Sequence, residues 1–145
     1  MYFRTKEGQM NSKTIKQSLF YVTAVGVSIV LLFFFIGCSW IGYEVKSQCQ
    51  DAEREYGGGC TESLIALLKD ERKGFRARND AIWALGELGD RRALPVLQSF
   101  YTGNIPPREP LNKMISQYEL KKAIALASGG TNITAFIWRG TYGPK

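Results

Sequence analysis

Histidine is absent from the 145-residue chain. Its absence excludes a His-ligated zinc site and every catalytic dyad or triad that uses imidazole as the base. No serine or threonine has another plausible base close to it in the sequence. We therefore expect no enzyme activity, no metal ion, no cofactor and no small-molecule substrate.

Charged residues are missing from one long stretch, residues 17–43. Within it, the apolar run Leu19–Ile41 would be about 34 Å long as a helix, which is enough to cross a hydrocarbon core of about 30 Å. Tyr21, Trp40 and Tyr43 stand near its two ends, where membrane-spanning helices favour amphipathic aromatic rings. The sequence predicts a single transmembrane helix over residues 19–42.

The charges on the two sides of this helix differ. Residues 1–18 form a basic leader with four basic residues and one acidic residue, whereas the sixteen residues after Ile41 carry two basic and four acidic residues. By the positive-inside rule the N-terminus lies in the cytoplasm. The remainder of the chain is expected to be extracytoplasmic, on the outer side of a bacterial cell membrane.

An alternative interpretation of the apolar run stays open. The residues Phe35–Cys38 resemble the lipobox of bacterial lipoproteins, in which the Cys becomes lipidated and N-terminal after cleavage. The leader is long for such a signal, Phe35 stands where Leu is usual, and Trp40, Ile41 and Tyr43 extend the apolar pattern beyond the cleavage point. These departures favour an uncleaved span, and both interpretations place the rest of the chain on the same side.

Cysteine is scarce, with three residues in the chain. Cys38 falls in the apolar run, where a small buried side chain is expected. Cys49 and Cys60 lie beyond it, separated by a segment that contains three consecutive glycines and can turn back on itself. In an oxidising compartment this pair is expected to form a disulfide, and a loop so short would contribute about 2–3 kcal/mol of stability.

The net charge of +6 could indicate a nucleic-acid-binding protein, but much of it lies outside the predicted domain. The leader supplies three of these charges, so residues 43–145 carry 15 basic and 12 acidic residues. A surface with so small an excess is an ordinary solvated one. We expect no nucleic-acid binding, which would also require the basic loop 69–78 to face the cytoplasm.

Beyond the membrane the chain has a helical pattern throughout. Residues 43–56 contain no helix breaker, so the membrane helix should continue until the glycines end it. Thr61 is placed to cap a helix over 62–69, and a longer helix is predicted for 75–88, ending at Gly89.

Part of this region has small, apolar and turn residues at regular spacing: Arg78, Ala81, Ala84-Leu85-Gly86, Leu88, Gly89-Asp90, Ala93-Leu94-Pro95 and Leu97. This pattern resembles the short HEAT repeat of phycobilisome lyases. In this pattern the alanines and Gly86 allow helices to approach closely, Gly89 ends a helix, and Pro95 is tolerated in the first turn of the next. The resemblance implies an all-α fold and names no activity, because nothing in the chain marks a bilin site.

We therefore predict an all-α chain in which the transmembrane helix is followed by a small α-solenoid of about two HEAT-like repeats, residues 61–130. Residues 43–60, with the disulfide loop, would cover the first repeat. The second repeat would pair helices at 91–101 and 115–128, joined by the Pro-rich connection 102–112. A capping tail, 131–145, would cover it, because its segment 133–142 is too apolar to be left in water.

On a helical wheel of residues 75–88, Trp83 lies about 200° from the predicted core face of alanines and leucines. A large side chain in this place suggests a protein-binding patch on the concave surface of the repeats. We expect the patch to comprise Trp83, Arg72, Arg76, Asn79 and Glu87. In the alternative the C-terminal segment or the membrane helix covers Trp83, and the working surface lies on the Pro-rich connection around Arg108.

Two functions fit these features. The first is a membrane-anchored extracytoplasmic scaffold or adaptor that binds another protein, as an accessory subunit of a larger membrane complex. The second is a ligand-handling module similar to a chromophore lyase, or a lipoprotein with the same binding role. The absence of histidine and of an activated nucleophile favours the first.

Overall fold

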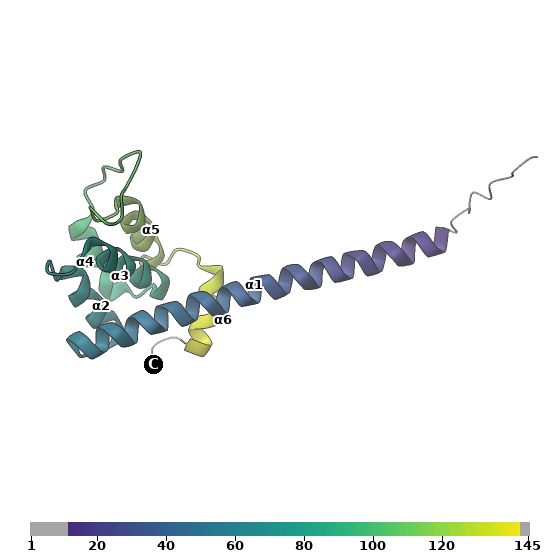
Figure 1. Cartoon of the computed structure of the whole chain (residues 1–145), viewed down its shortest axis with the longest axis horizontal. Helices are drawn as coiled ribbons and strands as arrows, with labels where there is room; N and C mark the ends of the chain where they lie inside the picture. Colours follow the sequence, from purple (N-terminus) through teal and green to yellow (C-terminus); the bar gives the residue numbers. More distant parts are fainter. Residues whose placement is uncertain (1–11, 143–145) are drawn as a thin grey trace, which may run out of the picture. The chain divides into compact units, whose positions relative to one another are not determined.

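The computed structural model describes residues 12–142, and within them all regular structure is helical (Figure 1). Residues 1–11 of the predicted leader and the last three residues of the predicted tail lie outside this range. The chain divides into two compact units, residues 1–37 and 38–145. The predicted all-α class is confirmed for the described residues.

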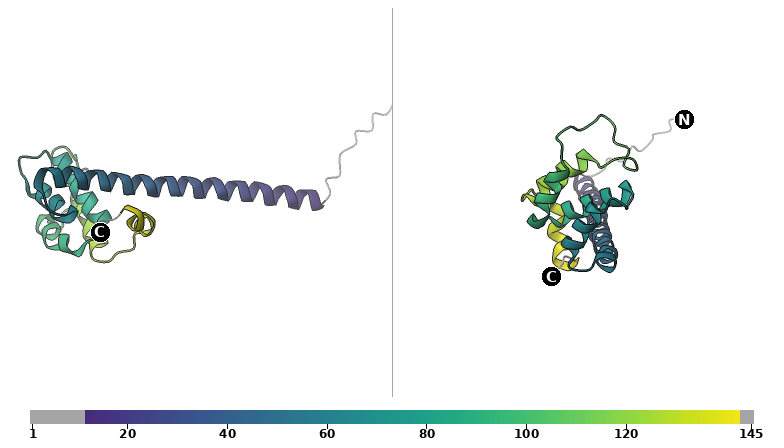
Figure 2. Two further views of the ribbon diagram at one scale, coloured as in Figure 1. Left: turned by 90° about the horizontal axis from the view of Figure 1, so that it is seen from below. Right: turned by 90° about the vertical axis from the view of Figure 1, so that its left-hand side faces the viewer.

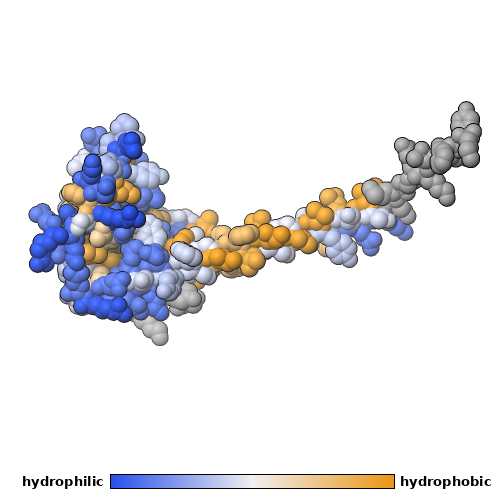
Figure 3. Space-filling view, in the orientation of Figure 1, coloured by the Kyte–Doolittle hydropathy of each residue, from blue (hydrophilic) through white to orange (hydrophobic). Residues whose placement is uncertain are grey.

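The longest element is α1, Ser12–Tyr56, a continuous helix of 45 residues. Its apolar portion is long enough to cross a membrane, and none of its most apolar window is buried. Figure 3 shows apolar side chains along this part of the surface. The core helix of a soluble protein would be mostly covered, so the helix has the properties of a membrane span or a signal sequence.

From Cys38 onward α1 gains a buried stripe that belongs to the second unit. Its members recur at intervals of four and three residues: Cys38, Gly42, Val45, Cys49 and Ala52. This spacing places them along one side of a helix. As predicted, α1 ends at the glycine triplet, where Gly57 and Gly58 adopt φ of 71° and 85° that favour glycine.

The predicted disulfide joins Cys49 of α1 to Cys60, with 4.8 Å between the Cα atoms. Cys60 is the first residue of α2, Cys60–Lys69, two residues earlier than the sequence indicates. Thr61 is not its N-cap, because Gly59 occupies that position and the Thr61 hydroxyl donates to Asp90 Oδ2 at 2.9 Å. The side chain thus connects α2 to the next helical pair.

The central element of the second unit is α3, Phe75–Leu88, which packs against both α2 and α5. It ends as predicted at Gly89, whose φ is 63°. At Gly86 the α5 backbone comes so close that an added Cβ would lie 2.8 Å from the Ala123 Cα and 2.9 Å from its Cβ. Glycine is therefore what permits the α3–α5 contact.

The next helical pair begins with a 3-10 turn, η1 (Arg91–Ala93), that leads into α4, Leu94–Phe100, with Pro95 in its first turn. The partner helix α5, Gln117–Ala127, is capped by Ser116, whose hydroxyl accepts from Glu119 N at 3.0 Å. Helices α4 and α5 pack against each other. Helices thus occur at both predicted places, although they are shorter than predicted.

The last helix is α6, Ile133–Tyr142, which packs on α3. Ala135 and Trp138 are buried in the core, and Arg139 Nε donates to the Glu87 carbonyl at 3.0 Å, near the C-terminus of α3. The tail therefore packs against α3 of the first helical pair, whereas the sequence predicts that it covers the second repeat. Contrary to the expectation that its apolar residues are covered, Ile133 and Phe136 remain 68% and 91% exposed.

Candidate protein-binding surface

Trp83 lies half-buried on α3, at the edge of the core. It borders a narrow hollow whose other walls are Gly86 and Glu87 of α3 and Glu119, Lys122, Ala123 and Leu126 of α5. The neighbouring side chains in this hollow thus come from α5 and not from the tail or α1. Trp83 therefore lies at the α3–α5 contact and is only partly accessible to solvent.

Asn79 was predicted to belong to the binding patch, but its side chain is 97% buried, with 3% of its surface exposed. Its Nδ2 donates to the carbonyls of Leu111 and Met114, both at 2.9 Å, and its Oδ1 accepts from Ser116 N at 2.8 Å. All three partners lie in the connection that leads into α5. Asn79 positions this connection and is not available to a partner protein.

The remaining predicted residues lie in different places, and Glu87 is the one that borders the hollow beside Trp83. Glu87 lines the same hollow and accepts from Asn132 Nδ2 at 2.8 Å. Arg72 lies in the turn between α2 and α3, where its guanidinium binds both oxygens of Asp70 at 2.9 Å. Arg76 and Arg108 are exposed.

The Asp70 carboxylate also holds the turn between α2 and α3 to the end of α1. Tyr56 Oη donates to Asp70 Oδ2 at 2.9 Å. Burial and this hydrogen bond raise the pKa of Tyr56 to about 12, and hydrogen bonds from Arg72 and Tyr56 hold the pKa of Asp70 below its ordinary value. The two groups stabilise the turn and present no group poised for acid or base catalysis.

The Pro-rich connection between α4 and α5 is fixed at both ends. Gln117 Oε1 accepts from Thr102 N at 2.8 Å, and Gln117 Nε2 donates to the Phe100 carbonyl at 3.2 Å. Near the other end the Glu109 carboxylate accepts from Ser116 Oγ at 2.5 Å and from Gln117 N at 2.7 Å. A carboxylate at a helix N-terminus is favoured by the free N–H groups and the helix dipole.

The Pro-rich connection and the start of α5 line a hollow of about 420 Å³ that is open to solvent. Its walls are Ile105, Pro106, Pro107, Glu109, Leu111, Ser116, Tyr118 and Glu119. Tyr118 and Leu111 are 55% and 46% exposed, so the hollow presents large side chains to solvent. Glu119 lines this hollow and the hollow beside Trp83, so the two form one surface, which we call the α5 surface.

Sequence reasoning pointed to Trp83 and to the Pro-rich connection but missed Tyr118 and Glu109. Tyr118 lies on the exposed side of α5, and nothing in the neighbouring sequence indicates that a hollow adjoins it. Glu109 precedes its partner Ser116 by seven residues, outside the spacing of a capping box. Both roles depend on how the connection folds back over α5.

A third hollow, of about 300 Å³, lies between α1 and α3 and has an acidic rim. Its charged walls are Glu44, Asp51, Glu55, Asp80 and Lys73, and Lys73 Nζ pairs with Glu55 at 2.6 Å. Burial raises the pKa of Asp80, against the charge of Arg76. In the part of the chain that the structure describes, no three His, Cys, Asp or Glu residues are arranged to hold a metal ion.

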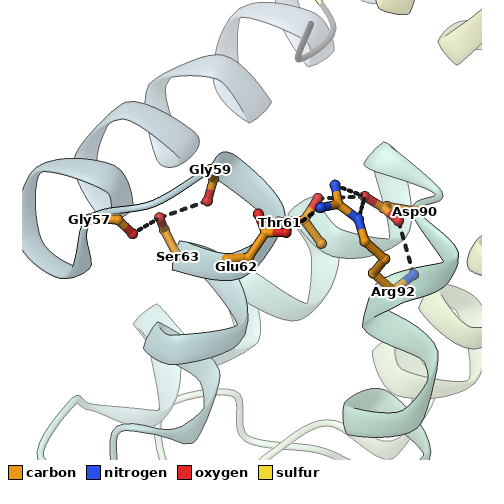
Figure 4. A network of polar contacts seen from close by, with 7 residues as sticks. All are labelled: Gly57, Gly59, Thr61, Glu62, Ser63, Asp90 and Arg92. Carbon is orange, nitrogen blue, oxygen red and sulfur yellow. Dashed lines mark hydrogen bonds and ion pairs between the residues drawn. The ribbon is translucent and has the colours of Figure 1, made fainter.

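Asp90, in the middle of the HEAT-like pattern, has a structural role (Figure 4). Asp90 accepts from Arg92 N and Arg92 Nε at 2.9 Å each, and Arg92 also pairs with Glu62 of α2. With the bond from Thr61, these contacts join α2 to η1. The hydrogen bonds from Arg92 lower the pKa of Asp90 to about 2.

Comparison with known proteins agrees with this architecture. The family model of the PBS lyase HEAT-like repeat matches residues 77–102, which run from α3 through α4. No curated protein and no solved structure matches the chain. The second unit is thus a helical module that contains a HEAT-like repeat, a class associated with protein interaction and with lyases.

Proposed function

We propose that this chain is a membrane-anchored scaffold or adaptor that binds another protein outside the cytoplasm. The observation that carries the proposal is the α5 surface, in which Trp83 is half-buried and Tyr118 and Leu111 are exposed beside two hollows that share Glu119 as a wall. Aromatic side chains in partly desolvated pockets contribute most of the free energy of many protein interfaces.

The rigidity of this surface supports the proposal. Binding is weakened when a loop must be ordered first, because the lost conformational entropy opposes association. Here Asn79, Glu109 and Gln117 hold the Pro-rich connection through buried or half-buried hydrogen bonds before any partner arrives. A loop fixed in this way is suited to recognition of a folded partner.

The anchor is supported by the uncovered apolar part of α1. The basic leader favours a cytoplasmic N-terminus, and the Cys49–Cys60 disulfide favours an oxidising, extracytoplasmic location for the second unit. In this arrangement α2–α3 and α4–α5 are two HEAT-like pairs of a short solenoid. Its partner is a protein of the same membrane, as part of a larger complex.

Site-specific photocrosslinking in cells tests the proposal. We expect benzoylphenylalanine in place of Tyr118 to yield a discrete crosslinked product, because this side chain borders the larger hollow. The matched control carries the probe in place of Gln98, which is exposed on α4 away from both hollows. Equal yields at the two positions, or no product at Tyr118, would contradict binding through the α5 surface.

A further inference from the structure

Helix α6 has two apolar sides, and the core covers one of them. Ala135 and Trp138 are each 1% exposed. At 100° per residue, Phe136 and Ile133 fall on the opposite side of the helix. The 91% exposure of Phe136 is the largest among the exposed large hydrophobic residues of the described chain. We call Ile133 and Phe136 the outer face of α6.

The direction of this outer face is set by polar contacts at both ends of α6. Asn132 caps the helix by accepting from Ala135 N at 3.0 Å, and its Nδ2 donates to Glu87 Oε2 at 2.8 Å. Near the other end, Arg139 donates to the Glu87 carbonyl. Because α3 holds α6 at two points, the helix cannot turn its outer face into the core without losing both contacts.

The position of α6 along α1 indicates what the outer face meets. Figures 1 and 2 show α6 beside α1, toward the N-terminal side of the α1 segment that belongs to the second unit. In that segment Cys38 is 1% exposed, whereas Trp40 and Tyr43, within the next turns, are 72% and 67% exposed. The second unit therefore covers one side of α1 at the level where the predicted span leaves the bilayer.

We propose that the outer face of α6 inserts into the headgroup boundary of the bilayer that α1 crosses. The inference rests on the membrane anchor of the proposed function. Short amphipathic helices with aromatic and aliphatic side chains bind in this region, about 5–10 Å deep. Trp40 and Tyr43, exposed near the end of the predicted span, have the character of an interfacial aromatic belt. A lipid surface would cover these side chains and the outer face together.

Insertion at this place would give the second unit two contacts with the membrane. A single helix leaves a domain free to rotate and tilt, whereas a second contact beside it limits both motions. The α5 surface would then be presented to partners in the same membrane at a fixed height. A fixed height above the membrane would help an adaptor to bind a partner within a membrane complex.

Spin labels on the full chain in proteoliposomes test the inference. Cysteines for labelling are introduced one at a time into a Cys38→Ala background as Phe136→Cys, Val30→Cys and Gln98→Cys, while the native disulfide stays closed. Val30 is 68% exposed in the apolar part of α1, and Gln98 is exposed on α4. Collision rates with oxygen, which concentrates in lipid, and with a water-soluble nickel complex are then compared.

We expect the ratio of oxygen to nickel collisions at position 136 to lie clearly above the ratio at position 98 and below the ratio at position 30, which is near the centre of the predicted span. A water-like ratio at 136 with a lipid-like ratio at 30 overturns the inference and leaves the anchor intact. A water-like ratio at 30 overturns the anchor, and the inference with it. Shielding of position 136 from both reagents also overturns the lipid contact, because a second copy of the chain would then cover the face.

Discussion

The closest approach of two helices in the second unit, at Gly86 and Ala123, gives the sharpest stability prediction. A methyl group at position 86 would lie 2.8 Å from the Ala123 Cα, whereas carbon atoms in contact are ordinarily about 3.5–4.0 Å apart. Since the opposing atom belongs to the α5 backbone, no side-chain rotation relieves the clash. Gly86→Ala therefore requires the two helices to move apart.

The size of the effect follows from two opposing terms. Overpacking of a core costs about 1–3 kcal/mol, and contact with backbone argues for the upper end of that range. Alanine in a helix interior is about 1 kcal/mol more favourable than glycine. The net loss is about 2 kcal/mol, which lowers the melting temperature of a domain of about 100 residues by about 10 °C.

The assay is thermal unfolding of the full chain in detergent, followed by circular dichroism. Gly74→Ala is the matched control, because Gly74 has a negative φ and nothing within 4 Å of the added Cβ. We expect the control to change stability by less than about 1 kcal/mol. A rise in melting temperature for Gly86→Ala would mean that helix propensity alone operates, and it would refute the close α3–α5 contact.

Three further predictions follow from other contacts. Asn79→Ala should lower the free energy of unfolding by about 2–4 kcal/mol, because it leaves several buried backbone groups without partners, and chemical denaturation measures the loss. Cys60→Ala should lower it by about 3 kcal/mol, whereas an unchanged value would mean that the Cys49–Cys60 bridge does not restrain the unfolded chain. The pKa of Asp90 in the folded state, about 2, lies below its ordinary value. The contribution of Asp90 to the free energy of unfolding is therefore present above about pH 4 and is lost as the pH falls toward 2. Asp90→Asn should remove this part of the pH dependence of stability.

The local features of the fold could be predicted because they depend on neighbouring residues. Gly57 and Gly89 end helices where left-handed backbone is needed, and Pro95 starts one, so each signal lies within a single turn. The disulfide was predictable for the same reason, since a short glycine-rich segment joins its two cysteines. Helix positions are accordingly where sequence and structure agree best.

The residues of the binding surface could not all be predicted, because their exposure depends on how many other helices pack against α3. The wheel assigned one buried face to α3, but α3 packs against both α2 and α5, so Asn79 on a second face is buried too. Trp83 borders α5 for the same reason. The periodicity of one helix shows which of its faces is apolar. It does not show that another segment of the chain will cover a polar side chain such as Asn79 and form hydrogen bonds with it.

Helix α6 illustrates the same limit in the opposite direction. Four of the six residues 133–138 are large and apolar, which predicted that the segment is covered. Only one side of α6 can face the core, however, because α6 packs on α3 from one direction. Trp138 and Ala135 take that side, which leaves Ile133 and Phe136 outside. The number of apolar residues was evident from the sequence, and their division between two environments required the packing.

Thiol labelling on intact cells tests the central claim, an extracytoplasmic module tethered by α1, most directly. A membrane-impermeant maleimide is added to cells that carry the wild-type chain or the Gln98→Cys variant, whose new thiol is exposed on α4. The account predicts no labelling of the wild-type chain, because Cys49 and Cys60 are bonded and Cys38 is buried, and labelling of the variant on intact cells. Thiols that become reactive only after the cells are lysed would place the second unit in the cytoplasm and contradict the account.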